Sequence, residues 1–221
     1  MQFGLSEEQI LLQDNVNRFL DDNSPLDRVR AYADGGADAD IWTGLAELGI
    51  PALLIPEAHG GIGLQPLDAA IVAECLGSHI APTPFLGSAV MAPTALVASG
   101  GDYGELLADI AAGTMRIGIA FGEAIKRRND AGVSVKDGRM SGTSMYAFDA
   151  DADAYLVADQ HQHIYLVRTN DAGLTRSNLA TVDKTRRTVE LNYENVMAEL
   201  VSDDPSVFEA SIDIGRMALA A

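Results

Sequence analysis

The sequence has few positive charges, one cysteine and no long apolar run, and each shortage argues against a class of protein. Lys and Arg number 15 against 32 Asp and Glu, a formal net charge of −17, which argues against a nucleic-acid partner. The single Cys75 cannot form an intramolecular disulfide and is typical of a reducing compartment. No run of about 18 apolar residues indicates a membrane span, and the opening MQFGLSEEQ lacks the parts of a secretion signal. We therefore expect a cytoplasmic protein.

The few positive charges are unevenly placed. Residues 1–115 carry 16 acidic residues, three arginines and no lysine, a formal charge of −13. Residues 116–221 carry 16 acidic residues and 12 Lys and Arg, a formal charge of −4. An anionic ligand such as a nucleotide or coenzyme A is better tolerated by the second half. The alternative for most of these charges is an acidic, solvated surface.

The first half has the periodicity of amphipathic helices. Ser6 and Gln9 have the spacing of a capping box, and Leu12, Val16, Phe19 and Leu20 then share one helical face. Glycine, proline and serine punctuate the chain after each further helical segment. The pattern predicts helices near residues 26–33, 40–48, 66–76, 85–98 and 103–112.

At Arg116 the apolar period changes to that of strands. Short runs rich in branched and aromatic residues are separated by turn signals such as Lys136-Asp137-Gly138. Regularly spaced short strands favour a small antiparallel barrel or sandwich. The predicted fold is thus α+β and multidomain, with a helical domain over 1–115 and a β domain over 116–205. Strands are predicted at residues 117–121, 133–135, 154–158, 163–168 and 188–193.

Residues 206–221 predict the start of a further helical domain. Ser206 and Glu209 have capping-box spacing, and SIDIGRMALAA then continues as apolar helix with no terminating glycine or proline. Such a helix needs a surface to pack on. We therefore expect either the front of a longer protein or a protein that needs a partner surface.

Several familiar motifs are incomplete. Gly60-Gly61-Ile62-Gly63 lacks the third glycine of a dinucleotide loop, because Pro66 stands there, so a turn is favoured. The Asp149–Asp153 run resembles the start of a calcium loop, but Ala154 and Gln160 occupy positions where that loop needs Gly and Glu. We interpret this run as a solvated turn.

The remaining reactive side chains also give no catalytic or metal site. His161 and His163 could bind a metal, but no third metal ligand is identifiable in the sequence, so we interpret them as part of a polar hairpin tip. Cys75 lies in an apolar helix and is interpreted as a core residue, and no GxSxG elbow is present. Lys126-Arg127-Arg128 is the densest cationic segment and could meet a phosphate, although an exposed loop is the commoner fate of such a run. From residues alone we predict no catalytic group and no metal ligand.

A family resemblance extends this interpretation. WTGLAELGIPALLIPEAHGGIGLQPLDAAIVAECLG followed by SHIAPTPF resembles the amino-terminal helical domain of acyl-CoA dehydrogenases. RIGIAFGEA, SGTSMYAFDADADAYLVA and DKTRRTVELNYENV resemble segments of that family's middle β domain. The Asp183–Arg187 element is most similar to the branch acting on steroid and other bulky coenzyme A thioesters. The resemblance covers the whole chain, without the family's carboxy-terminal helical bundle.

The resemblance implies FAD as cofactor and an acyl-CoA as substrate. In this family a glutamate removes the α-proton while flavin N5 accepts the β-hydride, and that glutamate belongs to the bundle. Family members usually form dimers or tetramers. Gly122-Glu123-Ala124 stands where the family usually has Thr-Glu-Pro, Tyr146 replaces a tryptophan and Phe148 a threonine. The implied cofactor-binding residues are Phe121, Gly122, Glu123, Tyr146 and Phe148.

The acyl group is expected to lie against the helix from Phe85 to Val97, with Phe85, Ser88 and Ala92 as substrate-binding residues. Our leading hypothesis is oxidation of an acyl-CoA to the 2-enoyl-CoA, with this chain supplying the flavin and acyl walls but not the base. One alternative is a noncatalytic subunit with a decayed FAD site, partnered by an acyl-CoA dehydrogenase-like subunit. Another is a flavin monooxygenase relative on the same fold.

Overall fold

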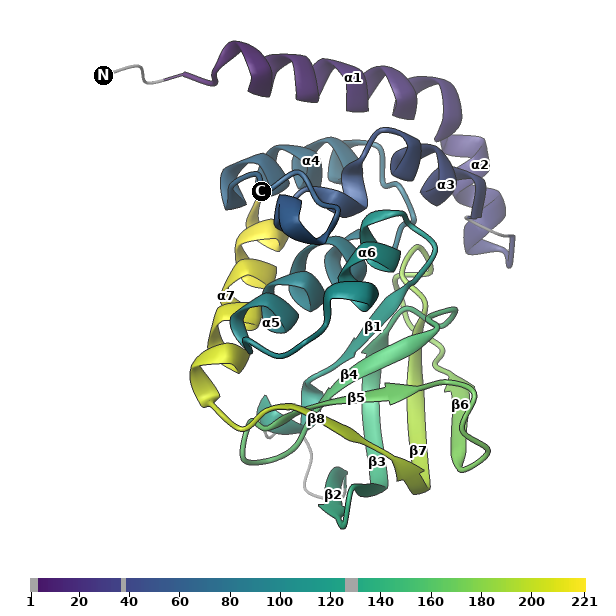
Figure 1. Cartoon of the computed structure of the whole chain (residues 1–221). Helices are drawn as coiled ribbons and strands as arrows, with labels where there is room; N and C mark the ends of the chain where they lie inside the picture. Colours follow the sequence, from purple (N-terminus) through teal and green to yellow (C-terminus); the bar gives the residue numbers. More distant parts are fainter. Residues whose placement is uncertain (1–3, 37–38, 126–130) are drawn as a thin grey trace.

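The computed structural model describes residues 4–36, 39–125 and 131–221, with helices gathered over one side of a sheet (Figure 1). The α-helices of the first half form from amphipathic segments, and the first begins at the predicted capping box of Ser6 and Gln9. These helices are α1 (Glu7–Asn23), α2 (Leu26–Ala33), α3 (Ala39–Glu47), α4 (Pro66–Ser78), α5 (Ala92–Ala98) and α6 (Gly104–Ala111).

The predicted helix over 85–98 forms as two helices of different type. Its first part, η3 (Phe85–Met91), is a π-helix, and α5 follows at once. Pro93 explains the change, because it has no N–H with which to bond the carbonyl four residues earlier. Three short 3-10 helices connect the other elements: η1 (Ile50–Ala52), η2 (Glu57–His59) and η4 (Gly122–Ile125). The predicted turn at Gly60–Gly63 lies between η2 and α4.

The second half forms one sheet with the strand order β6-β7-β3-β1-β4-β5-β8, and β2 pairs with β3. The α+β class is confirmed, but the sheet is mixed, because β1 and β4 run parallel. Over the described residues the order does not close into a barrel. The strands are β1 (Ile117–Ala120), β2 (Gly132–Lys136), β3 (Arg139–Phe148), β4 (Ala154–Ala158), β5 (Ile164–Arg168), β6 (Leu174–Asn178), β7 (Thr188–Met197) and β8 (Glu199–Ser202).

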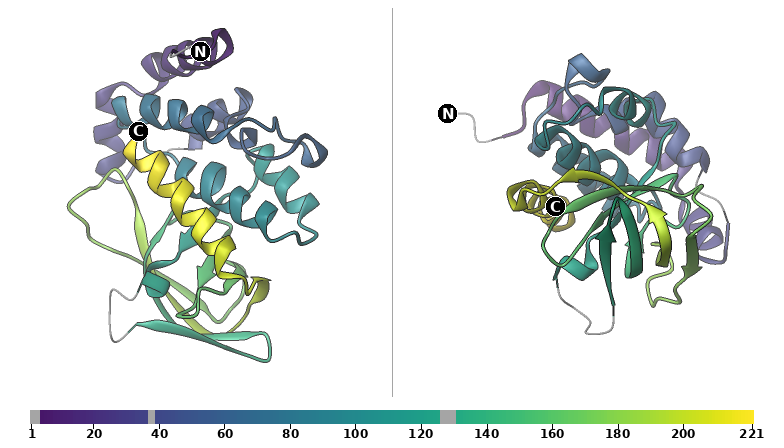
Figure 2. Two further views of the ribbon diagram at one scale, coloured as in Figure 1. Left: turned by 90° about the vertical axis from the view of Figure 1, so that its left-hand side faces the viewer. Right: turned by 60° about the horizontal axis from the view of Figure 1, so that its bottom comes forward.

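Helix α7 (Pro205–Ala220) returns from the sheet to the helical layer (Figure 2). Its start differs from the prediction: Asp204, not Ser206, is the N-cap, and its carboxylate accepts from the Ser206 amide at 2.9 Å. Pro205 suits the first helical position because its φ is fixed and it lacks an N–H. The surface that this helix was expected to need is supplied in part by this chain, because its inner face packs on α4, α5 and η3.

One hydrophobic core joins the helices to the sheet. Buried side chains of α1, α3, α4 and α5 are continuous with those of β1, β4 and β5, and with Val207 and Phe208 of α7. A second cluster lies on the other side of the sheet, between β3, β4 and β7. Two of the strands, β1 and β4, carry small or apolar residues on both faces and are buried throughout. The end of β1 therefore lies where the helical layer, the sheet and α7 meet.

Candidate functional site

A cavity of about 580 Å³ opens beside the end of β1, between β3 and α7. We call it the Tyr146 pocket. All five residues predicted to bind the cofactor line it, which brings together two segments more than twenty positions apart in the sequence. Its described lining is Leu86, Met91, Ile119, Phe121, Gly122, Glu123, Ile125, Met145, Tyr146, Phe148, Ile212, Gly215, Arg216 and Leu219.

Gly122 and Glu123 form the turn that follows β1. A Cβ at position 122 would lie 3.0 Å from the carbonyl oxygen of Met145, so the close approach of β3 favours glycine there. The Glu123 side chain is buried, and its Oε1 accepts a hydrogen bond from the Met145 amide at 3.0 Å. The carboxylate therefore fixes β3 against the turn, rather than standing free as a ligand.

Tyr146 stands at an irregularity of β3. The pairing of β3 with β7 shifts register between Ser144 and Ala147, and Tyr146 has a φ of 57°. A β-bulge re-aims a side chain and a non-glycine residue in this region is strained, which is typical of functional positions. The Tyr146 side chain is 57% exposed at the pocket, so its aromatic face is available to a ligand.

Phe121 connects the pocket to α7. Its ring lies 5.1 Å from that of Phe208, centroid to centroid, and both rings are buried. Ser211 of α7 donates to the carbonyl of Met91 at 2.9 Å, and a Cβ at Gly215 would meet the Met91 sulfur at 2.8 Å. These close contacts hold α7 as the far wall of the Tyr146 pocket.

The structure does not bring Ser88 and Ala92 to this pocket. Both are fully buried, and the Ser88 hydroxyl accepts from the Ile117 amide at 2.9 Å and donates to the Ile117 carbonyl at 3.4 Å. Ser88 thus ties η3 to β1 instead of facing a ligand. Phe85 lines a second cavity of about 530 Å³, which lies between the end of α4, the Asp183–Arg186 segment and the end of α7. We call this cavity the Phe85 pocket.

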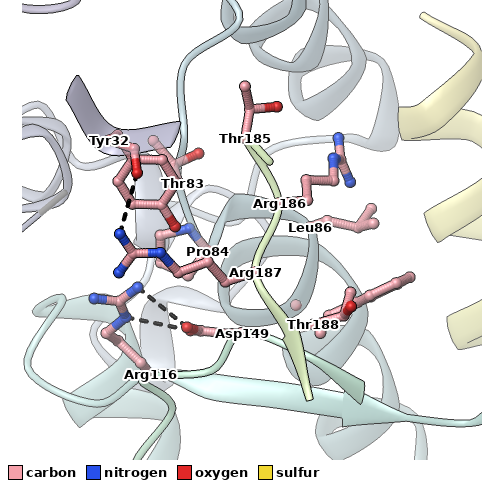
Figure 3. A pocket seen from close by; sticks show the side chains of 12 residues that line it. Tyr32, Thr83, Pro84, Leu86, Arg116, Asp149, Thr185, Arg186, Arg187 and Thr188 are labelled. Carbon is pink, nitrogen blue, oxygen red and sulfur yellow. Dashed lines mark hydrogen bonds and ion pairs between the residues drawn. The ribbon is translucent and has the colours of Figure 1, made fainter. Parts of the chain in front are cut away.

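A smaller third cavity, the Arg187 pocket, is lined by an ion-paired network (Figure 3). Arg187 lies 4.1 Å from the centroid of the Tyr32 ring, donates to the Tyr32 carbonyl at 3.2 Å and to that of Gly36, and approaches Asp151 at 3.7 Å. The 179–187 segment is thereby fastened to α2, far away in the sequence.

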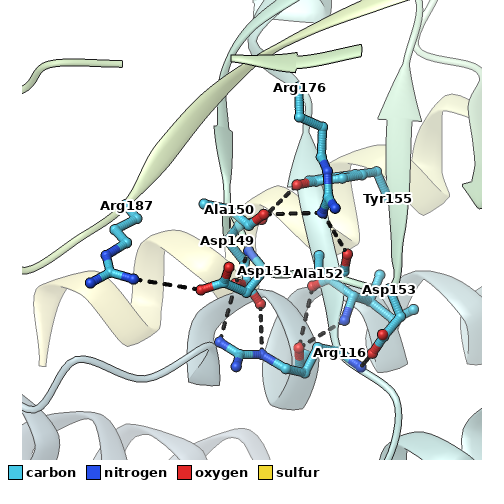
Figure 4. A network of polar contacts seen from close by, with 11 residues as sticks. Arg116, Asp149, Ala150, Asp151, Ala152, Asp153, Tyr155, Arg176 and Arg187 are labelled. Carbon is cyan, nitrogen blue, oxygen red and sulfur yellow. Dashed lines mark hydrogen bonds and ion pairs between the residues drawn. The ribbon is translucent and has the colours of Figure 1, made fainter. Parts of the chain in front are cut away.

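Arg116 and Asp149 form a second ion pair of this network (Figure 4). Two guanidinium nitrogens of Arg116 donate to the two carboxylate oxygens, both at 3.2 Å, and the side chains are 16% and 8% exposed. The interpretation of residues 149–153 as a solvated turn is therefore wrong for Asp149. Tyr155 donates to the Asp149 carbonyl at 2.7 Å, and burial raises the pKa of Tyr155 to about 12.

The other motifs keep structural roles. Cys75 is buried, and burial raises the pKa of its thiol, so it is a core residue as predicted. His161 and His163 lie at the β4–β5 turn, where Asp159 accepts from both backbone amides. Over the described ranges no cluster of three or more His, Cys, Asp or Glu could hold a metal. The Lys126–Arg128 segment lies outside the described residues.

The Tyr146 pocket fits a planar, largely apolar ring system such as that of a flavin. Its floor is apolar (Ile119, Met145 and Phe148), and one face is the exposed ring of Tyr146. The first amides of η4 have no partner within that helix, so they offer donors to a ligand. Sequence reasoning found this wall but missed Leu86, Met145 and α7, because their positions depend on packing across the chain.

A comparison with protein families finds a match to the description "Acyl-CoA dehydrogenase, N-terminal domain" over residues 6–113. Among curated proteins, the acyl-CoA dehydrogenase IpdE2 of Mycolicibacterium smegmatis is 39% identical over 99 residues, covering 43% of this chain and 32% of that protein. The acyl-CoA dehydrogenase FadE27 of Mycobacterium tuberculosis is 30% identical over 151 residues, covering 65% of this chain and 40% of that protein. The matched regions thus span 32% and 40% of the lengths of these two relatives.

Solved structures share the fold over nearly the whole chain. The Tcur3481–Tcur3483 steroid ACAD superposes with a TM-score of 0.82 at 24% identity, covering 97% of this chain and 62% of that chain. The ChsE4–ChsE5 complex from Mycobacterium tuberculosis gives 0.81 at 22% identity, covering 98% and 62%. Among the described residues, no helix is long and apolar enough to cross a membrane.

Proposed function

Because this chain belongs to the acyl-CoA dehydrogenase family, we propose that it takes part in flavin-dependent oxidation of an acyl-CoA thioester to the 2-enoyl-CoA. The observation that carries the proposal is the convergence of Phe121, Gly122, Glu123, Tyr146 and Phe148 on one cavity. The proposal includes FAD as cofactor and the cytoplasm as the compartment.

Bound FAD would supply a hydride acceptor, and the residues of this chain would hold and orient its ring. Tyr146 offers an aromatic face, and the amides of Gly122 and Glu123 offer donors at the edge of the pocket. Glu123 keeps these two elements in register through its bond to the Met145 amide. The buried faces of Phe121 and Phe208 exclude water from the inner side of the pocket.

The acyl group would extend from the Tyr146 pocket along η3 into the Phe85 pocket. Leu86 of η3 and Leu219 of α7 each line both cavities. We assign no residue of this chain as the base that removes the α-proton. Glu123 does not suit that role, because it is buried and its carboxylate is bonded to a backbone amide.

A second candidate function is that of a noncatalytic subunit. It is favoured by Gly122 and Phe148, which provide no side-chain hydrogen bond to a flavin at positions where the family has hydroxyl groups. The two solved structures described above are of paired proteins, Tcur3481 with Tcur3483 and ChsE4 with ChsE5. In this case an acyl-CoA dehydrogenase-like partner would carry the base and the FAD.

The visible absorption spectrum of the purified full-length gene product separates the two functions. A flavin band that is lost on anaerobic addition of an acyl-CoA is expected for the oxidoreductase. A protein that shows no flavin band, and regains none with added FAD, would overturn the first function and favour the second. Recording the same spectra with any subunit that co-purifies would show which subunit holds the flavin.

A further inference from the structure

Arg186 lies where two cavities meet. It lines both the Arg187 pocket and the Phe85 pocket, together with Thr83, Leu86 and Thr185. Leu86 also lines the Tyr146 pocket. A molecule that starts in the Tyr146 pocket and passes Leu86 therefore reaches the neighbourhood of the Arg186 side chain.

The backbone on both sides of Arg186 is held in place. Asp183 accepts from the Thr185 amide at 2.8 Å and from its hydroxyl at 2.6 Å, and these bonds help to lower the pKa of the Asp183 carboxyl. Arg187 is fastened to Tyr32. In Figure 3 the two arginine side chains leave the segment on opposite sides, Arg187 towards Tyr32 and Arg186 beside Leu86. Arg186 is thus presented to the cavities by a fixed segment.

Arg186 is exposed and, unlike its neighbours, its guanidinium is not ion-paired among the described residues; the Asp183 carboxyl interacts with it electrostatically. Arg116 is paired with Asp149, and Arg187 with Asp151. Within the part of the chain that the structure describes, the Arg186 side chain makes no hydrogen bond and no ion pair at all. A guanidinium carries five N–H donors and accepts nothing, so a ligand that covers it must provide acceptor oxygens.

The Phe85 pocket combines this donor group with an apolar wall. Leu76, Ile80, Phe85 and Leu86 form the apolar side. The polar side holds Arg186, the hydroxyls of Ser78 and Thr83, and the carboxylates of Glu74 and Asp183. A purely hydrocarbon acyl chain here would remove water from Arg186 without replacing its hydrogen bonds, which costs binding free energy. An oxygen at the far end of the chain would replace them.

We propose that Arg186 selects acyl groups that carry a carbonyl or carboxylate oxygen at the end remote from the thioester. This inference rests on the proposed function, since it assumes that the acyl group extends from the Tyr146 pocket into the Phe85 pocket. A site built to hydrogen-bond a polar group discriminates strongly against analogues that lack it. Arg186 is then the residue that sets the substrate class.

Three thioesters of equal length test this inference: octanoyl-CoA, 7-oxooctanoyl-CoA and suberoyl-CoA. Their dissociation constants are measured by titration calorimetry on the full-length holoprotein with any subunit that co-purifies. At least one oxygenated thioester is expected to bind about tenfold or more tightly than octanoyl-CoA. The two oxygenated probes distinguish a neutral carbonyl from a carboxylate as the preferred group.

Variants then assign the preference to Arg186. Arg186→Met is expected to abolish the preference, because octanoyl-CoA then covers no guanidinium and should bind more tightly than to wild type, and Arg186→Lys is expected to keep part of the preference. Arg168→Met is the matched control, because Arg168 is exposed on β5 and lines none of the three cavities. It should leave all three constants unchanged.

Different outcomes test the role of Arg186 and the acyl-CoA function on which it rests. Equal affinity for the three thioesters, or a preference that survives in Arg186→Met, overturns the role of Arg186 while acyl-CoA binding stands. Failure of all three thioesters to bind a correctly folded holoprotein overturns the acyl-CoA function, and the inference with it. A preference that is lost in Arg186→Met and kept in Arg168→Met supports both.

Discussion

The Glu123 carboxylate accepts a hydrogen bond from the Met145 amide, which lies 22 positions later in the sequence, at 3.0 Å. Glu123 is 6% exposed, so this bond is made away from solvent. It joins the turn after β1 to the residue that immediately precedes Tyr146. The aromatic face of the proposed flavin site is therefore positioned through a side chain that itself faces the protein interior.

Glu123→Leu should test this positioning role. It leaves the Met145 amide buried without an acceptor, so we expect a loss of about 1–3 kcal/mol in the free energy of unfolding and weaker FAD binding. Glu123→Gln keeps an acceptor oxygen and should lie closer to wild type in both. Urea denaturation and FAD titration provide the measurements.

Glu105→Leu, at an exposed position of α6, is the control for the Glu123 variants and should stay within about 0.5 kcal/mol of wild type. Equal effects of Gln and Leu at position 123 would show that the bond to Met145 does not matter.

Ser88→Ala should lower stability rather than alter ligand binding. Ser88 is fully buried, and its hydroxyl is the acceptor for the Ile117 amide at 2.9 Å. Its loss should cost about 1–3 kcal/mol and speed hydrogen exchange at Ile117, while Ser134→Ala on exposed β2 should do neither. Changed acyl-CoA affinity with unchanged stability would instead restore Ser88 as a substrate-binding residue.

The sequence predicted most elements because their apolar periods and capping residues are local. Helices α1 to α4 and α6 and strands β4 and β5 were placed to within a few residues, and the start of α1 follows from Ser6 and Gln9 alone. Strands β3, β6 and β8 were missed. Ser, Gly and Thr interrupt the first, and the other two carry few buried apolar residues, so their pairing depends on partners distant in the sequence.

The candidate site was predicted in part. Its flavin wall lies on two contiguous segments whose motifs resemble those of the family, and both segments line the Tyr146 pocket. Ser88 and Ala92 were expected at the acyl wall, but small residues also allow close packing, which is how η3 meets β1. The contribution of α7 and the place of Arg186 at two cavities are visible only in three dimensions.

Breaking the Arg116–Asp149 pair should be far more costly than breaking a surface pair. Asp149→Asn leaves the Arg116 charge, 16% exposed, without its counter-charge, so we expect a loss of about 3 kcal/mol in unfolding free energy. Asn is chosen because Asp149 has a φ of 68°, a conformation that Asn tolerates.

The matched control for this pair is Asp27→Asn. It breaks the exposed Arg30–Asp27 pair and should cost no more than about 1 kcal/mol. Chemical denaturation of both variants provides the comparison, and similar small losses would contradict a structural role for the buried pair.

His79 should make stability depend on pH. Burial is the largest influence on the pKa of His79 and lowers it, but hydrogen bonds to the Cys75 carbonyl and to Asp21, at 3.1 Å, together raise it above its usual value. A raised pKa in the folded state means that the protonated ring favours folding. This contribution is complete below about pH 6.5, the usual value, and is lost as the pH rises through the folded-state pKa.

Unfolding free energies measured across this range should show that decline in the wild type and a flatter profile in His79→Gln. His161→Gln, an exposed histidine at the β4–β5 turn, should keep the wild-type profile. A decline that persists unchanged in His79→Gln would assign the pH dependence to another group.

The measurement that tests the proposed flavin site most directly is an experimental structure of the full-length gene product with FAD. The isoalloxazine ring is predicted to lie in the Tyr146 pocket, against the Tyr146 ring and the backbone of Gly122 and Glu123. A flavin held elsewhere, or a pocket filled by protein side chains at saturating FAD, would contradict the assignment.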